Sequence, residues 1–370
     1  MPRPGPANDS RSARASSTTD GRRRPLRPHA FSCISEKSKA FSPDMSVAIF
    51  VINWNGWQDT VSCLSSIEAQ AFTDYRVYVL ENGSSDRSAD HLSRHLELRH
   101  DGEWRRLDVT QGDAPAMTPP RWTLLLSGEN HGFAGGCNIG IHLALAEGAD
   151  WIFLLNNDAN LETDTLDHLL ETARESGAAI VGSRIRDETG RHPLFDGGRW
   201  PGMLFGRARE HPPEPPGDHW NTGYVEGSAL LLRAGAARAR IAECGFAFDP
   251  ALFLYCEDAE LSRWVYSRGL GCVISRKARV RHGHSRSSGG AGSPIPYYYL
   301  TRNRILLARG WLDAPHRLLF HAYYLPTRLL LLLGHAFRRD WRAFGAVLQG
   351  LKDGYRGRGG VWSRHGGHRG

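Results

Sequence analysis

The sequence lacks the cysteine patterns that mark zinc sites, dithiol redox sites and disulfide frameworks. Its six cysteines are scattered, with no Cys-x-x-Cys pair and no spacing typical of zinc ligands. It also lacks an apolar stretch of the secretory signal type and any internal repeat. We therefore expect free thiols in a protein of the reducing cytoplasm.

The central part of the chain is not basic, although the formal net charge of the 370 residues is +7. Residues 1–44 carry +5 and residues 316–370 carry +8, whereas residues 45–315 carry −6. A body that binds nucleic acid is more often basic along one face, so we expect no nucleic-acid partner. Basic ends indicate solvated tails or contacts with a membrane surface.

The sequence lacks a long uninterrupted apolar segment that would span a membrane. The longest apolar run, LLFHAYYLPTRLLLLLGHAF at 318–337, is interrupted by His321, Pro326, Arg328 and His335. A span needs about 20 mostly apolar residues. We expect instead an amphipathic helix in peripheral contact with an anionic membrane; the alternative is a helix packed on the folded body.

Three regions are expected along the chain. Residues 1–44 are rich in Pro, Ser and Arg and predict a disordered basic extension, and Met45 is the expected true start. Residues 45–315 predict the folded domain, with halves at 45–185 and 186–315. Residues 316–370 predict a helical basic tail.

An alternation of strands and helices begins at Met45. Continuous apolar runs predict strands over 47–52, 75–80, 122–126, 151–155 and 178–182. Helical patterns lie between them at 57–69, 137–147 and 164–176. A further helix is expected to run from a cap at Ser84 or Ser85 through His95. This order predicts an α/β fold with a doubly wound sheet. Further on we expect a surface excursion over 187–222, strands at 228–233 and 271–282, and helices at 258–268 and within 303–356.

Polar or glycine-rich residues follow four successive predicted strands. Each group has a simpler explanation as a turn or a helix cap. Ligands of open α/β sheets nevertheless bind beyond the carboxyl ends of the strands, so together the groups indicate a site. The groups are Asn53, Trp54 and Asn55; Glu81 and Asn82; NHGFAGGCNIG at 130–140; and Asn156, Asn157 and Asp158.

The ordered motifs of residues 46–309 resemble glycosyltransferase family 2, in particular its bacterial rhamnosyltransferase-like branch. The motifs are VINWNG, LENGSSDRS, NHGFAGGCNIG, FLLNNDAN, FLYCEDAELSRWVYSRG, HGHSRSSGG and YYYLTRNR. The resemblance implies a GT-A fold, with a mostly parallel mixed sheet flanked by helices. It implies a nucleotide-sugar half over 45–185 and an acceptor half over 186–315, followed by the helical extension.

The resemblance also implies roles for single residues. Asp158 is the expected ligand of Mg²⁺ or Mn²⁺, with help from His282 or His284, while Asn156 stands where the family has its first Asp. Glu81 replaces the usual Asp of the nucleotide site. The other expected contacts of the nucleotide sugar are Asn53, Trp54, Asn55, Asn82, Asn130, Gly132, Phe133, Ala134, Gly135, Gly136, Asn138, Asn156, Asn157 and Arg302. Cys137 departs from the family's Asn and is expected to serve packing.

Glu257 and Asp258 begin a predicted helix, where acidic residues also simply favour the helix dipole. The resemblance makes Asp258 the general base, and we expect Glu257 to raise the pKa of Asp258 by like-charge repulsion. The implied activity is inverting transfer of a hexose or deoxyhexose, such as rhamnose, to a glycan or lipid-linked acceptor. The expected donors are dTDP- or UDP-sugars. The alternatives are a sugar-nucleotide-binding protein without catalysis and a nucleotidyltransferase, although no basic residue follows the first strand as the latter requires.

Overall fold

The computed structural model describes residues 46–109, 120–199, 202, 204, 217–283 and 292–362, all within one unit of the chain, residues 39–370. The strands are β1 (Val47–Asn53), β2 (Tyr75–Asn82), β3 (Trp104–Asp108), β4 (Trp122–Ser127), β5 (Trp151–Asn156), β6 (Ala159–Leu161), β7 (Ile180–Arg186), β8 (Pro193–Phe195), β9 (His219–Asn221), β10 (Ala229–Arg233) and β11 (Cys272–His282). The helices are α1 (Trp57–Glu68), α2 (Ser88–Arg99), α3 (Gly132–Ala146), α4 (Thr165–Ser176), α6 (Ala234–Cys244), α7 (Glu257–Ser267), α8 (Ile295–Trp311), α9 (Ala314–Phe337) and α10 (Trp341–Tyr355).

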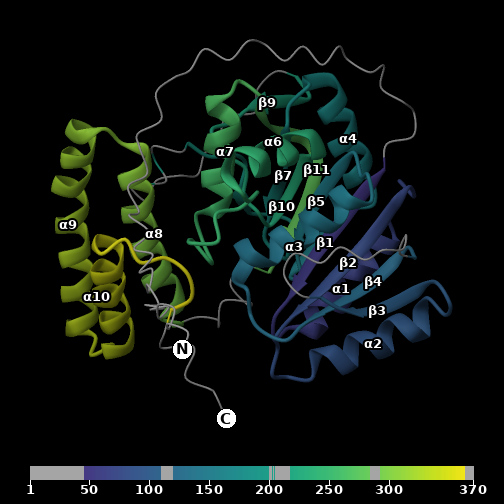
Figure 1. Ribbon diagram of the computed structural model, residues 1–370, viewed down its shortest axis with the longest axis horizontal. Helices are drawn as coiled ribbons and strands as arrows, with labels where there is room; N and C mark the ends of the chain where they lie inside the picture. The colour runs from purple at the N-terminus through teal and green to yellow at the C-terminus, as the bar shows by residue number, and fades with distance from the viewer. Residues whose placement is uncertain are drawn as a thin grey trace, which may run out of the picture. The chain divides into compact units, whose positions relative to one another are not determined.

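The strands form one mixed, mostly parallel sheet with helices beside it (Figure 1). Its order is β3-β4-β2-β1-β5-β10-β7-β11-β6, with β8 beside β7 and β9 beside β11. The strands from β3 to β5 are parallel, and β10 runs antiparallel between β5 and β7. The predicted α/β class is therefore confirmed.

The central strand β1 shows why the apolar runs become strands covered on both faces. Val47, Ile49 and Val51 belong to the apolar cluster that contains the buried side chains of α1, α2 and α4. Ala48 and Phe50 point to the other face and belong to the cluster that contains those of α3. Because successive side chains of a strand alternate between faces, only a continuous apolar run suits this position.

The structure corrects several element boundaries. Helix α3 begins at Gly132 and not at Cys137, so most of the expected glycine-rich loop is the first part of a helix. Strand β7 continues to Arg186, past the expected end at Gly182. Helix α6 was not predicted, although its alanine-rich sequence AGAARARIAEC favours a helix.

Strand β3 was missed because its sequence, Trp-Arg-Arg-Leu-Asp, is too charged to look like a strand. It lies at the edge of the sheet and, among the strands that the structure describes, pairs only with β4. Edge strands tolerate charged side chains, which protect the edge from pairing with other chains.

The helices expected within 303–356 are present, and the first begins earlier, at Ile295. Helices α8, α9 and α10 pack on one another (Figure 1). Helix α9 contains Pro326. Among the helices that the structure describes, none is long and apolar enough to cross a bilayer.

Candidate functional site

The strand register brings the predicted polar residues to one edge of the sheet. Asn53, at the end of β1, pairs with Glu81 of β2, and its neighbour Ile52 pairs with Asn156 of β5. The parallel strands β1, β2 and β5 therefore end side by side. This is the edge at which open α/β sheets bind ligands.

The first two strand ends are tied together by hydrogen bonds. The Glu81 carboxylate accepts the N–H of Ser84 (2.7 Å), which closes the turn after β2. The Ser84 hydroxyl in turn accepts hydrogen bonds from the Asn55 N–H (2.9 Å) and from the Asn53 side chain (3.3 Å). Trp54 lies between them and is half-buried. The network orders this corner of the sheet through side chains that the sequence assigned to ligand binding.

Asn82 joins the end of β2 to the start of α3. Its amide nitrogen donates to the Asn130 side chain and to the Gly132 carbonyl, both at 3.2 Å. Its amide oxygen accepts the N–H of His131 (3.0 Å). Asn130 also accepts the Gly132 N–H (2.8 Å). Asn82 and Asn130 thus fix where α3 begins.

The glycines of α3 let the helix approach the sheet. A Cβ on Gly136 would lie 2.9 Å from Ile52 Cδ1, and one on Gly140 would lie 2.2 Å from Phe50 Cδ2. A Cβ on Gly135 would meet only the His131 side chain, at 2.9 Å. The close approach that we expected toward a ligand is, for Gly136, an approach toward the strands.

The start of α3 also contacts the segment before α7. Gly132 adopts a left-handed φ of +69°, and a Cβ there would lie 2.3 Å from the Phe253 carbonyl oxygen. The same carbonyl accepts the N–H of buried Ala134 (3.1 Å). Gly132 is therefore needed both for its conformation and for this contact.

Asn138 and Cys137 serve the interior of the protein. The Asn138 amide donates to the Phe248 carbonyl (2.8 Å) and accepts its N–H (2.9 Å), so both ends of the amide have partners within the fold. This differs from the ligand contact we expected of Asn138. Cys137 is buried, and burial raises its thiol pKa, as suits a packing residue.

The two amides after β5 have different surroundings. Asn157 is buried and donates to the Gly56 carbonyl (3.2 Å) and the Thr60 hydroxyl (3.1 Å), which ties the end of β5 to α1. Asn156 is partly exposed, and its Nδ2 lies 3.3 Å from Nε2 of His282. Asn156 is therefore the amide that remains at the surface of the site.

Asp158 lies next to His282, which ends β11. Nε2 of His282 is 2.9 Å from Oδ1 of Asp158, and both side chains are buried. The short strand β6 pairs with β11 through Ala159 and His282, so the backbone holds the two residues in register. The other expected candidate, His284, lies outside the described residues.

The pair suits a divalent cation only in part. Carboxylate oxygen and imidazole nitrogen are ordinary ligands of Mn²⁺, and Mg²⁺ prefers oxygen. No group of three or more His, Cys, Asp or Glu side chains fit to hold a metal occurs among the residues that the structure describes. Mg²⁺ sites commonly use one or two protein carboxylates together with substrate phosphates, and the carboxylate of Asp158 fits a shared site of this kind.

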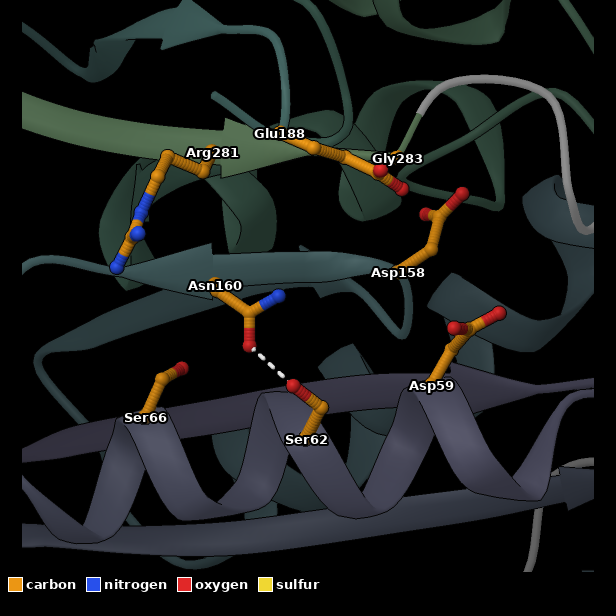
Figure 2. Close-up of a pocket in the computed structure, with 8 residues that line it drawn as sticks. All are labelled: Asp59, Ser62, Ser66, Asp158, Asn160, Glu188, Arg281 and Gly283. Carbon is orange, nitrogen blue, oxygen red and sulfur yellow. Dashed lines mark hydrogen bonds between the residues drawn. The ribbon is translucent and has the colours of Figure 1, made fainter. Parts of the chain in front are cut away.

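A pocket of about 440 Å³ lies beside Asp158. It is lined by Asp59, Ser62, Ser66, Asp158, Asn160, Glu188, Arg281 and Gly283. Figure 2 shows the carboxylates of Asp59, Asp158 and Glu188 toward one side of the pocket and the Arg281 guanidinium on the other. Apart from Asp158, none of these residues was singled out from the sequence. Glu188 follows the end of β7, so the rule that sites gather beyond strand ends applies to it too.

Glu257 and Asp258 form the first turn of α7. The Asp258 carboxylate accepts the N–H groups of Gly227 (3.0 Å) and Ala259 (2.7 Å). Burial raises the pKa of Asp258, against the lowering effect of these two N–H groups. Burial, and then the charge of Asp258, raise the pKa of Glu257. The like-charge repulsion that we expected to raise the pKa of Asp258 therefore raises the pKa of Glu257 instead. The pKa of Asp258 is raised by burial.

The segment before β10 connects Asp258 to the end of β5. The N–H of Gly227 is bound by Asp258, and the carbonyl of Ser228 accepts the N–H of Asn156 (3.0 Å). A Cβ on Gly227 would lie 3.0 Å from the Phe133 ring and 3.5 Å from Asp258 Cβ. Phe133, Asp258 and the end of β5 thus meet around Gly227 and Ser228.

Arg302, an expected contact of the nucleotide sugar, binds carbonyl groups within the fold. It is fully buried, and its guanidinium donates to the carbonyls of Ala251 (3.1 Å), Leu252 (2.8 Å) and Gly360. Its neighbour Asn303, which the sequence analysis did not single out, donates to the carbonyls of Leu252, Leu254 and Tyr255. Both residues hold the segment that leads into α7.

Comparison with known proteins agrees with this architecture. A galactofuranosyltransferase, GlfT1 of Mycolicibacterium smegmatis, is 30% identical over 192 residues, which cover 50% of this chain and 59% of that protein. An uncharacterized protein of Mycobacterium tuberculosis is 30% identical over 140 residues, 37% of this chain and 48% of that one. The chain thus spans about half the length of the curated relatives it matches.

Among solved structures, the crystal structure of GalNAc-T7 with UDP, GalNAc and Mn²⁺ matches with a TM-score of 0.53 at 13% identity. The match covers 74% of this chain and 49% of that one and shows a shared GT-A fold. The family model described as glycosyl transferase family 2 matches residues 48–237, more than half of the chain. The chain with this strand-end site therefore belongs to glycosyl transferase family 2.

Proposed function

We propose that the protein is an inverting, metal-dependent glycosyltransferase of the rhamnosyltransferase-like branch. It transfers a hexose or deoxyhexose from a dTDP- or UDP-sugar to a glycan or lipid-linked acceptor in cell-surface polysaccharide synthesis. The observation that carries the proposal is that Asp258 and Asn156, two positions before Asp158, bind the neighbouring residues Gly227 and Ser228 at the edge where β1, β2 and β5 end.

The donor side of the site uses the strand ends. The turn after β2 is surrounded by Glu81 and by the amides of Asn53 and Asn55. These polar groups would bind the hydroxyl groups and the base of the nucleoside. Asp158 and His282 would hold Mg²⁺ or Mn²⁺, and the bound ion would offset the negative charge of the leaving nucleoside diphosphate. Asn156, partly exposed beside His282, contacts the sugar.

The acceptor side uses Asp258 as the general base. The acceptor hydroxyl attacks the anomeric carbon, the bond from that carbon to the diphosphate oxygen breaks, and Asp258 takes the hydroxyl proton. The N–H groups of Gly227 and Ala259 fix the orientation of the carboxylate before reaction. A positioned base contributes about 10²–10⁴-fold to the rate.

The reducing cytoplasm is the compartment that we propose for the reaction. The cysteines Cys63, Cys137, Cys244, Cys256 and Cys272 are free thiols, and four of them are buried. This agrees with the expected reducing environment.

A thermal-shift screen against dTDP-, UDP- and GDP-sugars, with and without Mn²⁺ or Mg²⁺, tests the donor. We expect one donor class to raise the melting temperature, and to do so more strongly with the metal. Slow release of nucleoside diphosphate should accompany binding, and NMR of a transferred sugar should show the inverted anomer. Binding without any release under acceptor-saturated conditions would instead identify a non-catalytic sugar-nucleotide-binding protein.

A further inference from the structure

Helix α9 exposes an apolar face. Its side chains Leu318, Leu319, Leu329, Leu330, Leu333 and Phe337 are each more than half exposed, and Phe337 reaches 92%. Surface helices of globular proteins normally direct their apolar stripe inward. Contiguous exposed apolar surface of this kind marks a protein or membrane interaction site.

The polar residues of α9 lie away from this face. His335 is buried, and the Arg328 guanidinium lies over the ring of the buried Tyr324, 4.8 Å from its centroid. At 100° per residue, Arg328 and His335 fall opposite Leu319 and Leu330 on the helix. The helix therefore packs its charged and aromatic side against α8 and presents its leucines outward.

A basic and aromatic cluster follows directly at the end of α9. Arg338, Arg339 and Arg342 are exposed, next to the exposed rings of Phe337 and Trp341. Over residues 316–370 there are ten Lys and Arg residues but only two Asp. Arginines beside aromatic rings suit the interface of an anionic bilayer, where the rings enter the headgroup region and the cations contact lipid phosphates.

We propose that the exposed face of α9, with Arg338, Arg339 and Arg342, docks the protein on an anionic lipid surface. The helix lies in the plane of the interface, in keeping with the absence of a spanning helix among the residues described. A second copy of the chain is the less favoured occupant, because pairing would bring two strongly basic segments together, whereas anionic lipid offsets their charge. This inference does not depend on the sugar-transfer proposal.

Vesicle co-sedimentation of the full chain tests the docking surface. We expect binding to vesicles of phosphatidylcholine with phosphatidylglycerol, and much weaker binding to phosphatidylcholine alone. Salt should weaken the binding, since it screens the arginines. The double variant Leu329→Glu and Leu330→Glu should lose roughly a hundredfold in vesicle affinity, because it places two charges in the face that would enter the lipid.

The matched control is Leu98→Glu, which changes a leucine on α2 that is also exposed. It should bind vesicles as the unaltered protein does, and all variants should keep the same unfolding midpoint. Unchanged vesicle binding by the double variant would overturn the proposal. So would a concentration-dependent dimer, seen by analytical ultracentrifugation, that the double variant abolishes while no form of the chain binds vesicles.

Discussion

The imidazole of His282 lies 2.9 Å from the carboxylate of Asp158, although 124 positions separate the two residues in the sequence. The pairing of β6 with β11 places them side by side, because Ala159 is opposite His282. A carboxylate that follows β5 thereby gains a neighbouring nitrogen from the far part of the sheet. Under the proposed function, this arrangement would supply two metal ligands beside the amide of Asn156.

Asp158→Ala should weaken metal-dependent binding of the nucleoside diphosphate. Loss of a ligand from a site with so few protein ligands should reduce metal affinity by at least about 10–100-fold. Isothermal titration calorimetry with Mn²⁺ and the diphosphate measures this directly. The control Asp164→Ala removes the acid of an exposed Asp–His pair on α4 and should leave binding unchanged. Equal affinity for the Asp158 variant would remove it from the site.

Asp258→Asn should reduce turnover by about 10²–10⁴-fold, because the amide cannot accept the acceptor's proton. Donor binding should change little, since the side chain keeps its size and its acceptor oxygen for the Gly227 N–H. Steady-state kinetics together with donor titration separates the two effects. Asp167→Asn, an exposed change on α4, serves as the control. Near-normal turnover by Asp258→Asn would show that another group takes the proton.

Glu257 should make the stability of the protein depend on pH. Because burial and the charge of Asp258 raise its pKa in the folded state, folding favours the protonated carboxyl. Its contribution is complete below the ordinary carboxyl pKa and is lost as the pH rises through the raised value. Across that window the unfolding free energy should fall by up to about 1.4 kcal/mol per pH unit.

Glu257→Gln should flatten this dependence, since the amide does not ionise. Urea unfolding at several pH values from the ordinary carboxyl range upward measures the slope. The exposed change Glu175→Gln on α4 should leave the slope as it is. If the unfolding free energy of the Glu257 variant had the same slope against pH, the Glu257 carboxyl of the unaltered protein would not ionise within the window.

The sheet was predictable from sequence wherever a strand is buried on both faces. Such strands, β1 and β5 among them, need continuous apolar runs that stand out in any window. Strand β3 escaped because an edge strand does not need such a run. The antiparallel direction of β10 also could not be read from its apolar sequence, because direction depends on how the chain returns.

The site was predictable as a set of strand ends but not as a set of contacts. The strand-end rule correctly brought Asn53, Glu81 and Asn156 to one edge of the sheet. It does not say whether an amide faces a ligand or the fold, and Asn138 and Arg302 proved to bind backbone groups. These partners lie about 50 to 110 positions away in the sequence, beyond the reach of a local pattern.

Asn303→Ala should destabilise the protein and misplace Asp258. The Asn303 amide lies 2.7–3.0 Å from the carbonyls of Leu252, Leu254 and Tyr255, in a segment where Phe253, Tyr255 and Cys256 adopt left-handed φ angles. Such angles cost about 1–3 kcal/mol each, so the segment depends on these hydrogen bonds. The Leu252 carbonyl keeps its hydrogen bond from Arg302, and loss of the donors to the Leu254 and Tyr255 carbonyls should cost about 1–3 kcal/mol of unfolding free energy.

The turnover of the Asn303 variant distinguishes positioning from simple packing. We expect its kcat to fall more strongly than its KM for the donor rises, because the segment leads directly into Asp258 and meets the start of α3 through Phe253. Asn303→Asp, which keeps the volume and removes the donors, should share this effect. The exposed change Gln58→Ala on α1 is the control. Unaltered kcat in both Asn303 variants would contradict the positioning role.

Gly140→Ala and Gly235→Ala should change stability in opposite directions. Both glycines are helical, but a Cβ on Gly140 would lie 2.2 Å from the Phe50 ring, whereas one on Gly235 meets nothing within 4 Å. Overpacking should make Gly140→Ala less stable by about 1–3 kcal/mol, since α3 must move away from β1. Gly235→Ala should gain up to about 1 kcal/mol from the better helix propensity of alanine. Urea unfolding of the two variants gives the comparison, and a Gly140 variant as stable as the unaltered chain would show that α3 does not pack so closely on Phe50.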